Sequence, residues 1–169
     1  MSGVPIPDNI DTQMIALVGG MVAPDYNFNW GIVNEQDETI GAFPRCVIDP
    51  TEEGSLADKE TNVDSIAGAG NQAYTNEVEK VLLVKGELPS FSSNPLFEAR
   101  TIMRQALDDL KMLFGRNRCL NGACDSIMYT GSQIENLKRN DTQRPLQLRV
   151  RVKIVYSQDR SNPTQYASA

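Results

Sequence analysis

Apolar and polar positions alternate strictly near the C-terminus. Residues 146–156 read Leu-Gln-Leu-Arg-Val-Arg-Val-Lys-Ile-Val-Tyr, with an apolar side chain at every even position. Because successive side chains of a strand point to opposite faces of a sheet, this pattern predicts a long strand with one buried face. The other face carries the cations Arg149, Arg151 and Lys153. These cations require water, anions or a partner's carboxylates around them.

Four further segments predict strands. Tyr26–Val33 has apolar side chains at alternate positions, and Ala42–Ile48 is a second extended segment. Tyr74–Lys85 contains four consecutive apolar residues, Val81 to Val84, which is typical of a central strand covered on both faces. Cys124–Leu137 predicts the strand that precedes the last one.

The helical signal is strongest in the middle of the chain. Asn94-Pro95 supplies a cap and a first-turn proline, and apolar residues then recur at helical spacing from Leu96 to Phe114. Gly115 is expected to end this helix. A shorter helix, capped by Asn9 or Asp11 and running through Val18, is expected near the N-terminus.

These elements predict an α+β fold in a single domain, residues 1–169: a mostly antiparallel β-sheet with helices packed on one face. Residues 1–9 are punctuated by proline and glycine and are expected to form a flexible N-terminal arm. Residues 49–73 read as a long acidic loop without secondary structure of its own. We expect this loop to be mobile in the free protein and ordered against a partner.

Charge is divided unevenly between the two halves of the chain. The net charge is -6, which does not indicate a nucleic-acid binder by bulk charge. Residues 1–90 carry 15 acidic and 4 basic side chains, whereas residues 91–169 carry 7 acidic and 12 basic ones. The two halves either neutralise each other within one protomer, or the acidic flank of one copy meets the basic flank of the next.

The residues that usually carry catalysis are absent or poorly placed. The chain has no histidine, which excludes Ser-His-Asp and Cys-His catalysis and removes the commonest metal ligand. Glu52-Glu53 and Asp108-Asp109 are the adjacent carboxylate pairs considered as catalytic candidates, and we interpret both as solvated surface acids. The sequence therefore predicts a protein that is not an enzyme and has no cofactor or metal.

Cysteine usage and hydropathy indicate the compartment. An odd count of three cysteines without a signal-peptide pattern predicts reduced thiols in a cytoplasmic setting. Cys119 and Cys124 lack further ligands for zinc and are expected to pack as small apolar side chains. The longest apolar run, Met14 to Val18, is too short to cross a bilayer, so we expect a soluble protein with no membrane partner.

An ordered set of segments in the C-terminal half resembles the tail terminator (tail completion) proteins of long-tailed bacteriophages. The segments are an apolar helix at 97–114, Asp-Ser-Ile-Met-Tyr-Thr-Gly-Ser at 125–132, Arg-Pro-Leu-Gln-Leu-Arg-Val at 144–150, and Tyr-Ser-Gln-Asp-Arg-Ser-Asn-Pro at 156–163. The N-terminal half matches more loosely, through its early helix, the Phe43-Pro44 entry into a strand and the acidic loop.

The resemblance implies a ring-forming structural virion protein, made in the host cytoplasm and located at the junction of tail and neck. Such proteins are similar in fold to tail tube proteins. They cap the head-proximal end of the tube as a hexamer, stop its growth and join it to the head-completion or connector protein of the neck. DNA then passes through the lumen without specific binding. A head-closure or neck connector protein is the alternative, and a nucleic-acid-binding module is a third possibility.

For a ring, the charge pattern suggests a contact between copies. We predict that Arg149, Arg151 and Lys153 bridge to carboxylates of an adjacent copy, and the candidate carboxylates are those of Glu52, Glu53, Asp58 and Asp64. The alternative is that the three cations are the solvated face of an edge strand that guards against aggregation. Cations lining a lumen would hold DNA by its phosphates, so we expect these three at protomer contacts instead.

Overall fold

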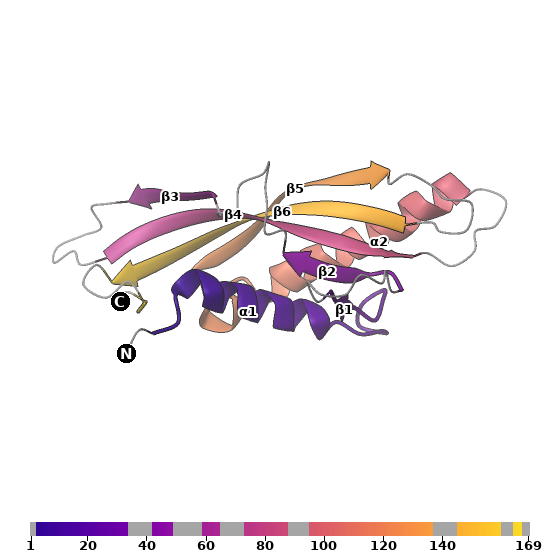
Figure 1. Ribbon diagram of the computed structural model, residues 1–169. Helices are drawn as coiled ribbons and strands as arrows, with labels where there is room; N and C mark the ends of the chain where they lie inside the picture. Colours follow the sequence, from indigo (N-terminus) through magenta and orange to yellow (C-terminus); the bar gives the residue numbers. More distant parts are fainter. Residues whose placement is uncertain are drawn as a thin grey trace.

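The protein is represented by a computed structural model (Figure 1), which describes residues 3–33, 42–48, 59–64, 73–87, 95–136, 145–159 and 164–166. Its elements in chain order are α1 (Ile6–Gly19), β1 (Gly31–Ile32), β2 (Arg45–Ile48), β3 (Lys59–Asp64), β4 (Ala73–Glu87), α2 (Pro95–Arg116), a 3-10 turn η1 (Leu120–Gly122), β5 (Ser126–Asn136) and β6 (Pro145–Asp159).

Within the described ranges the strands form one six-stranded sheet. Its order is β1-β2-β4-β6-β5, and β3 pairs with the part of β4 that β2 leaves open. β1 and β2 are parallel, and the other pairings between these strands are antiparallel. β4 and β6 pair along their full 15 residues, a ladder about 50 Å long. The predicted mostly antiparallel α+β fold is therefore confirmed.

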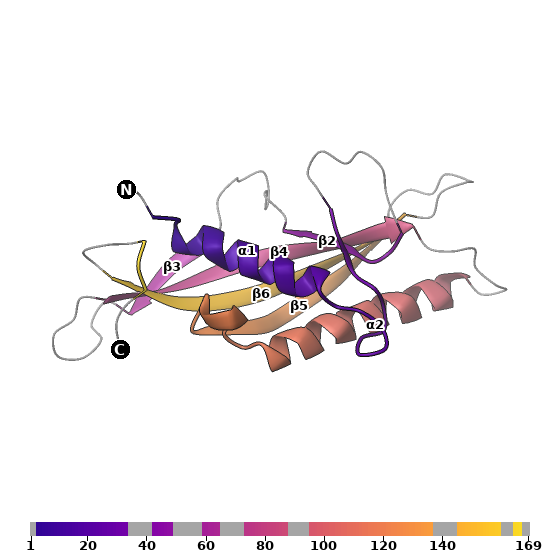
Figure 2. The ribbon, with the colours of Figure 1, turned by 90° about the horizontal axis from the view of Figure 1, so that it is seen from below.

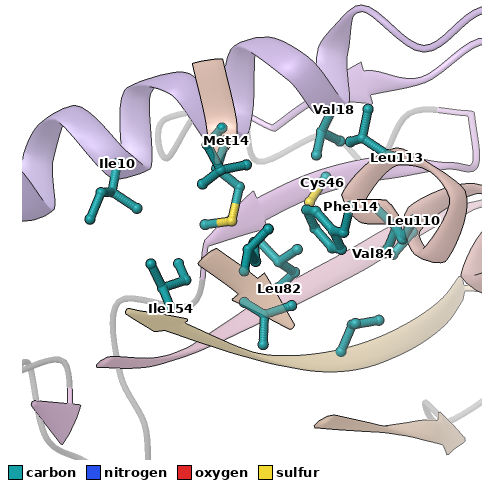
Figure 3. Packing of buried hydrophobic residues seen from close by; sticks show 14 of the residues in the cluster. Ile10, Met14, Val18, Cys46, Leu82, Val84, Leu110, Leu113, Phe114 and Ile154 are labelled. Atoms are coloured by element: carbon teal, nitrogen blue, oxygen red, sulfur yellow. The ribbon is translucent and has the colours of Figure 1, made fainter. Parts of the chain in front are cut away.

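Both helices cover the same face of the sheet (Figure 2). From β4 and β6, the buried side chains on this face occupy even-numbered positions, as the alternation in residues 146–156 predicts. α1 contributes Ile10, Met14 and Val18, and α2 contributes Leu110, Leu113 and Phe114 (Figure 3). These side chains meet Leu82, Val84 and Ile154 of the sheet in one hydrophobic core.

The first helix begins earlier than predicted. α1 starts at Ile6 with a proline in its first turn, so the flexible-arm prediction for residues 1–9 is wrong from Ile6 onward, and neither Asn9 nor Asp11 is the cap. Ile6, Ile10, Met14 and Val18 are all buried and recur every four residues. Burying Ile6 with the other three adds one more turn of apolar contact, and this outweighs the turn-forming tendency of the prolines.

The predicted strand at Tyr26–Val33 is confined to Gly31–Ile32. The residues before it form turns and bends that are held by Asp109 of α2. Its carboxylate accepts hydrogen bonds from the Asn27 backbone at 2.9 Å, the Asn27 side chain at 2.8 Å and Trp30 Nε1 at 2.9 Å. Asp109 is fully buried, so its interpretation as a solvated surface acid is wrong, whereas Asp108 is exposed.

The segment 49–73 is not entirely a loop, because Lys59–Asp64 forms β3 and Ala73 already belongs to β4. β3 supplies main-chain partners to the half of β4 that β2 does not reach. Residues 49–58 and 65–72 of the predicted loop lie outside the described residues. Residues Val81 to Val84 are all buried and β4 has neighbouring strands on both sides, which confirms a central strand. Both described helices lie on one face, so the prediction that this strand is covered on both faces is not met by a second layer.

Candidate assembly surface

The face of the sheet opposite the helices is a polar surface, which we call the open face. Arg149, Arg151 and Lys153 of β6 lie on it, because the even-numbered residues between them are buried in the core. Arg151 is exposed, and the side chains of Arg149 and Lys153 are 23% and 33% exposed. The predicted basic face of the terminal strand is thus present in the folded chain.

Arg149 is paired within its own chain. Its Nε donates to Glu135 Oε1 of the neighbouring strand β5 at 2.9 Å. The Gln147 side chain donates to the other oxygen of the same carboxylate. Glu135 lies opposite Gln147 in the β5–β6 register, so its two oxygens reach two successive open-face positions of β6. This arrangement ties the hairpin strands together on the solvent side.

Lys153 is paired toward the other neighbour. Its Nζ lies 2.7 Å from Glu77 Oε1 on β4. The hydrogen bond to Glu77 raises the pKa of the Lys153 ammonium, and the charges of Glu77 and Glu79 raise it further, whereas desolvation opposes them. Both carboxylates stand on the open face, where Glu79 is directly opposite Lys153 in the register. The cation is therefore held in its charged form by its own sheet.

Apolar side chains of β4 lie next to the two arginines. Val81 is opposite Arg151, and Leu83 is opposite Arg149. Both are on the open face yet are only 4% and 7% exposed. The aliphatic stems of arginines can shelter such residues while their guanidinium groups stay in water. The open face is consequently a charged layer over an apolar centre.

β6 is an internal strand, so the alternative interpretation of its cations as the solvated face of an edge strand is wrong. β4 pairs along one side of β6, and β5 pairs along the other from Leu146 to Val155. Pairing on both sides leaves β6 no free main-chain groups over that span to template aggregation. Among the described strands it is β5 that forms the corresponding edge.

The acidic residues predicted to meet these cations are not brought to them within the described chain. Glu52, Glu53 and Asp58 lie outside the described residues. Asp64 ends β3, where its backbone pairs with Thr75. The bridge between copies therefore stays a prediction, while Arg149 and Lys153 already have carboxylate partners in their own sheet.

The sequence predictions on metal binding, cysteines and membrane crossing concern other parts of the described structure. No group of three or more potential metal ligands occurs among the residues that the structure describes. Cys124 is buried, as predicted, and Cys46 is buried too. Cys119 is exposed, so its prediction as a packing side chain is wrong, and its thiol donates to the Asp125 carbonyl at 3.4 Å. No helix in the described ranges has the length and apolar content needed to cross a membrane.

A second cationic surface was not predicted from the sequence. Arg100, Arg104 and Lys111 are exposed on α2, and at about 100° per residue they fall within about 40° of one another around the helix axis. Arg118, also exposed, follows two residues after the helix ends. We call these four residues the α2 cation row. The interval of seven residues between Arg104, Lys111 and Arg118 is the signal that could have revealed it.

A groove accompanies the α2 cation row. It has a volume of about 470 Å³ and runs between the C-terminal end of α2 and the start of β5. Lys111 and Arg118 line it together with Phe114, Ile127, Met128 and Tyr129. The Lys111 ammonium lies 4.9 Å from the centre of the Tyr129 ring, a cation–π contact. The surface combines cations with the exposed side chain of Met128 and the half-buried ring of Tyr129.

No protein-family model matches this chain, and no curated protein matches its sequence significantly.

Proposed function

We propose that this protein is a structural virion component that caps the head-proximal end of a phage tail tube as a hexameric ring, stops tube polymerisation and forms the joint to the neck. The order of elements from α2 through β5 to β6 carries the proposal. This order matches the helix, turn and two-strand sequence on which the resemblance to tail terminators rests. The fold provides two extended charged surfaces, the open face and the α2 cation row, which suit contacts between proteins.

The distribution of charge supports a ring over a two-fold dimer. In a ring each protomer uses one flank to contact a different flank of its neighbour. A chain with a net charge of -11 over residues 1–90 and +5 over residues 91–169 supplies unlike flanks. Complementary charge sets the orientation and rate of such encounters more than their final affinity. The overall charge of -6 also disfavours holding DNA that must slide through a lumen.

The proposal is tested by adding the purified protein to polymerising tail tube protein and measuring tube lengths by electron microscopy. Capped tubes should be shorter and more uniform, with six copies of this chain at one end of each tube. Tubes of unchanged length and unoccupied ends would contradict the proposal. Particles lacking the protein should carry tails of abnormal length that are detached from filled heads.

Binding experiments with the same purified protein test the two alternative functions. A head-closure or neck connector protein would bind the portal ring of the head in the absence of any tube. A nucleic-acid-binding module would bind DNA tightly at physiological salt, and its affinity would fall steeply as salt is raised. Either result, obtained without tube capping, would replace the proposed function.

A further inference from the structure

The α2 cation row lies on the surface, and the described part of the chain supplies it with no carboxylate partner. The ion pairs formed among the described residues include Lys80 with Asp11, Arg149 with Glu135, and Lys153 with Glu77. Within the described ranges, no member of the row lies within 4 Å of a carboxylate oxygen. Asp108 is the exposed acid nearest to the row in sequence, four residues after Arg104. The cations of the row therefore remain largely available to form ion pairs with the carboxylates of a partner.

The groove beside the row adds apolar contact to charge. Met128 is 58% exposed on its rim, and Phe114 and Ile127 form part of its lining. An acidic peptide segment can bring carboxylates to the cations and aliphatic side chains to such a lining. The chain's net charge of -6 opposes the approach of a nucleic acid, which favours a protein segment as the occupant.

A segment of matching chemistry occurs in this chain. Residues 49–58 read Asp-Pro-Thr-Glu-Glu-Gly-Ser-Leu-Ala-Asp and contain four acidic side chains, no basic one, and the apolar pair Leu56-Ala57. The segment joins the end of β2 to the start of β3. Its four negative charges equal the four positive charges of the α2 cation row.

The topology separates the segment from the row within one copy. β2 and β3 both pair with β4 on the side away from β6, so the two strand ends that flank the segment lie at that side of the sheet. The row and its groove lie at the opposite side, along β5. Surfaces at opposite sides of one protomer can meet between successive copies in a head-to-tail arrangement, which forms a ring when the rotation between copies closes.

We propose that the α2 cation row and its groove receive the acidic segment 49–58 of a second copy of this chain. The contact deepens the proposed function, on which it rests, by naming the surfaces that join protomers. It also differs from the bridge predicted from sequence, in which the same acids meet Arg149, Arg151 and Lys153. Two of those cations are already engaged by Glu135 and Glu77.

The test compares two charge reversals of equal size in the full-length chain. Arg104→Glu with Lys111→Glu alters the row, and Arg149→Glu with Arg151→Glu alters the open face. Oligomer mass is measured by native mass spectrometry and light scattering at low and high salt, with circular dichroism as the check on folding. We expect the row variant to raise the dissociation constant about tenfold or more and the open-face variant to retain assembly.

Charge exchange distinguishes a direct contact from a structural effect. Glu52→Lys with Glu53→Lys should weaken assembly as the row variant does, and the chain combining both pairs of substitutions should recover it. A structural defect in α2 would not be rescued by changes in residues 49–58. Recovery therefore supports the contact, and failure of the combined chain to assemble overturns it.

Each other outcome decides against a named part of the proposal. Loss of assembly in the open-face variant alone would transfer the contact to Arg149 and Arg151. Binding of duplex DNA that depends on Arg104 and Lys111 would make nucleic acid the occupant. A wild-type chain that stays monomeric at about 1 mM and low salt would exclude the contact. Assembly that depends on the row but leaves tube length unchanged would support the contact and overturn the proposed function.

Discussion

The ammonium nitrogen of Lys80 lies 2.6 Å from Asp11 Oδ1, beneath the first helix. The Lys80 side chain is fully buried, because its position in β4 points to the helix-covered face between Val78 and Leu82. Asp11, on α1, is 37% exposed and brings its carboxylate over the sheet. A buried ammonium without a nearby anion is costly, so this pair fixes how α1 sits on β4.

Removing the negative charge of Asp11 should destabilise the fold. We expect Asp11→Asn to lower the free energy of unfolding by about 1–3 kcal/mol, because the Lys80 ammonium would remain buried with a weaker partner. Asp8→Asn, an exposed position on the same helix, should change it by less than about 0.5 kcal/mol. Urea unfolding followed by circular dichroism measures both. Equal effects of the two substitutions would contradict a specific role for the pair.

Asp109 should be essential for the ordered path of residues 22–30. Asp109→Asn replaces an acceptor oxygen with a donor among the N–H groups of Asn27 and Trp30, and we expect a loss of about 2–4 kcal/mol. Trp30 is the one tryptophan of the chain, so its fluorescence reports the site directly. Asp108→Asn, one residue away and exposed, is the control and should leave the emission spectrum unchanged.

The close approach of the chain at Gly86 predicts a severe steric effect. A Cβ added there would stand 2.3 Å from the Cα atom of Phe43, which belongs to backbone and cannot move aside cheaply. We expect Gly86→Ala to cost about 3 kcal/mol or more. Gly131→Ala in β5 has no atom within 4 Å of the new methyl group and should be nearly neutral. Thermal unfolding of the two variants decides; a tolerated Gly86→Ala would contradict the described packing.

One of the three cysteine thiols should react rapidly with a thiol reagent, and the other two should react slowly. Burial raises the pKa of the Cys46 thiol to about 12, and burial raises that of Cys124 to about 12 with added repulsion from Cys119 and Asp125. At pH 8 only about one in 10,000 of either thiol would be ionised. We expect a thiol reagent to label one group rapidly, to label three in denaturant, and to lose the fast reaction in Cys119→Ser.

The same thiols set a dependence of stability on pH. Their folded pKa values lie above the ordinary value of 9.0, so the unfolded chain loses protons first as pH rises. Their contribution to stability is complete below about pH 9 and is lost as pH approaches 12. Denaturant midpoints measured across this window should fall less in a Cys46→Ala chain than in the wild type.

The local pattern of apolar residues predicted an element correctly where that pattern alone decides which side chains are buried. The alternation in residues 146–156 predicted β6, and the spacing of apolar residues after Asn94-Pro95 predicted α2, which ends one residue beyond the expected Gly115. It failed at residues 26–30, where alternation was present but hydrogen bonds to Asp109, about 80 residues away in sequence, hold turns instead. Propensity cannot anticipate a partner that distant.

The candidate surfaces show the same division. The basic stripe of β6 was predicted because strand geometry alone assigns its odd positions to one face. Its pairing to Glu135 and Glu77 depends on sheet order, which no local pattern encodes. The seven-residue spacing of the α2 cation row can be read from the sequence. Its proposed role as a binding surface depends on the groove formed when α2 packs beside β5.

The sequence by itself determined the class of fold, its longest helix and strand, and the unequal charge of its two halves, because each follows from short-range periodicity or composition. Only the tertiary structure decided that Lys80 and Asp109 are buried, that the N-terminal helix begins at Ile6, and that β6 is an internal strand. Those outcomes depend on which distant groups can satisfy a buried charge or an apolar face, and that is settled only when the elements pack together.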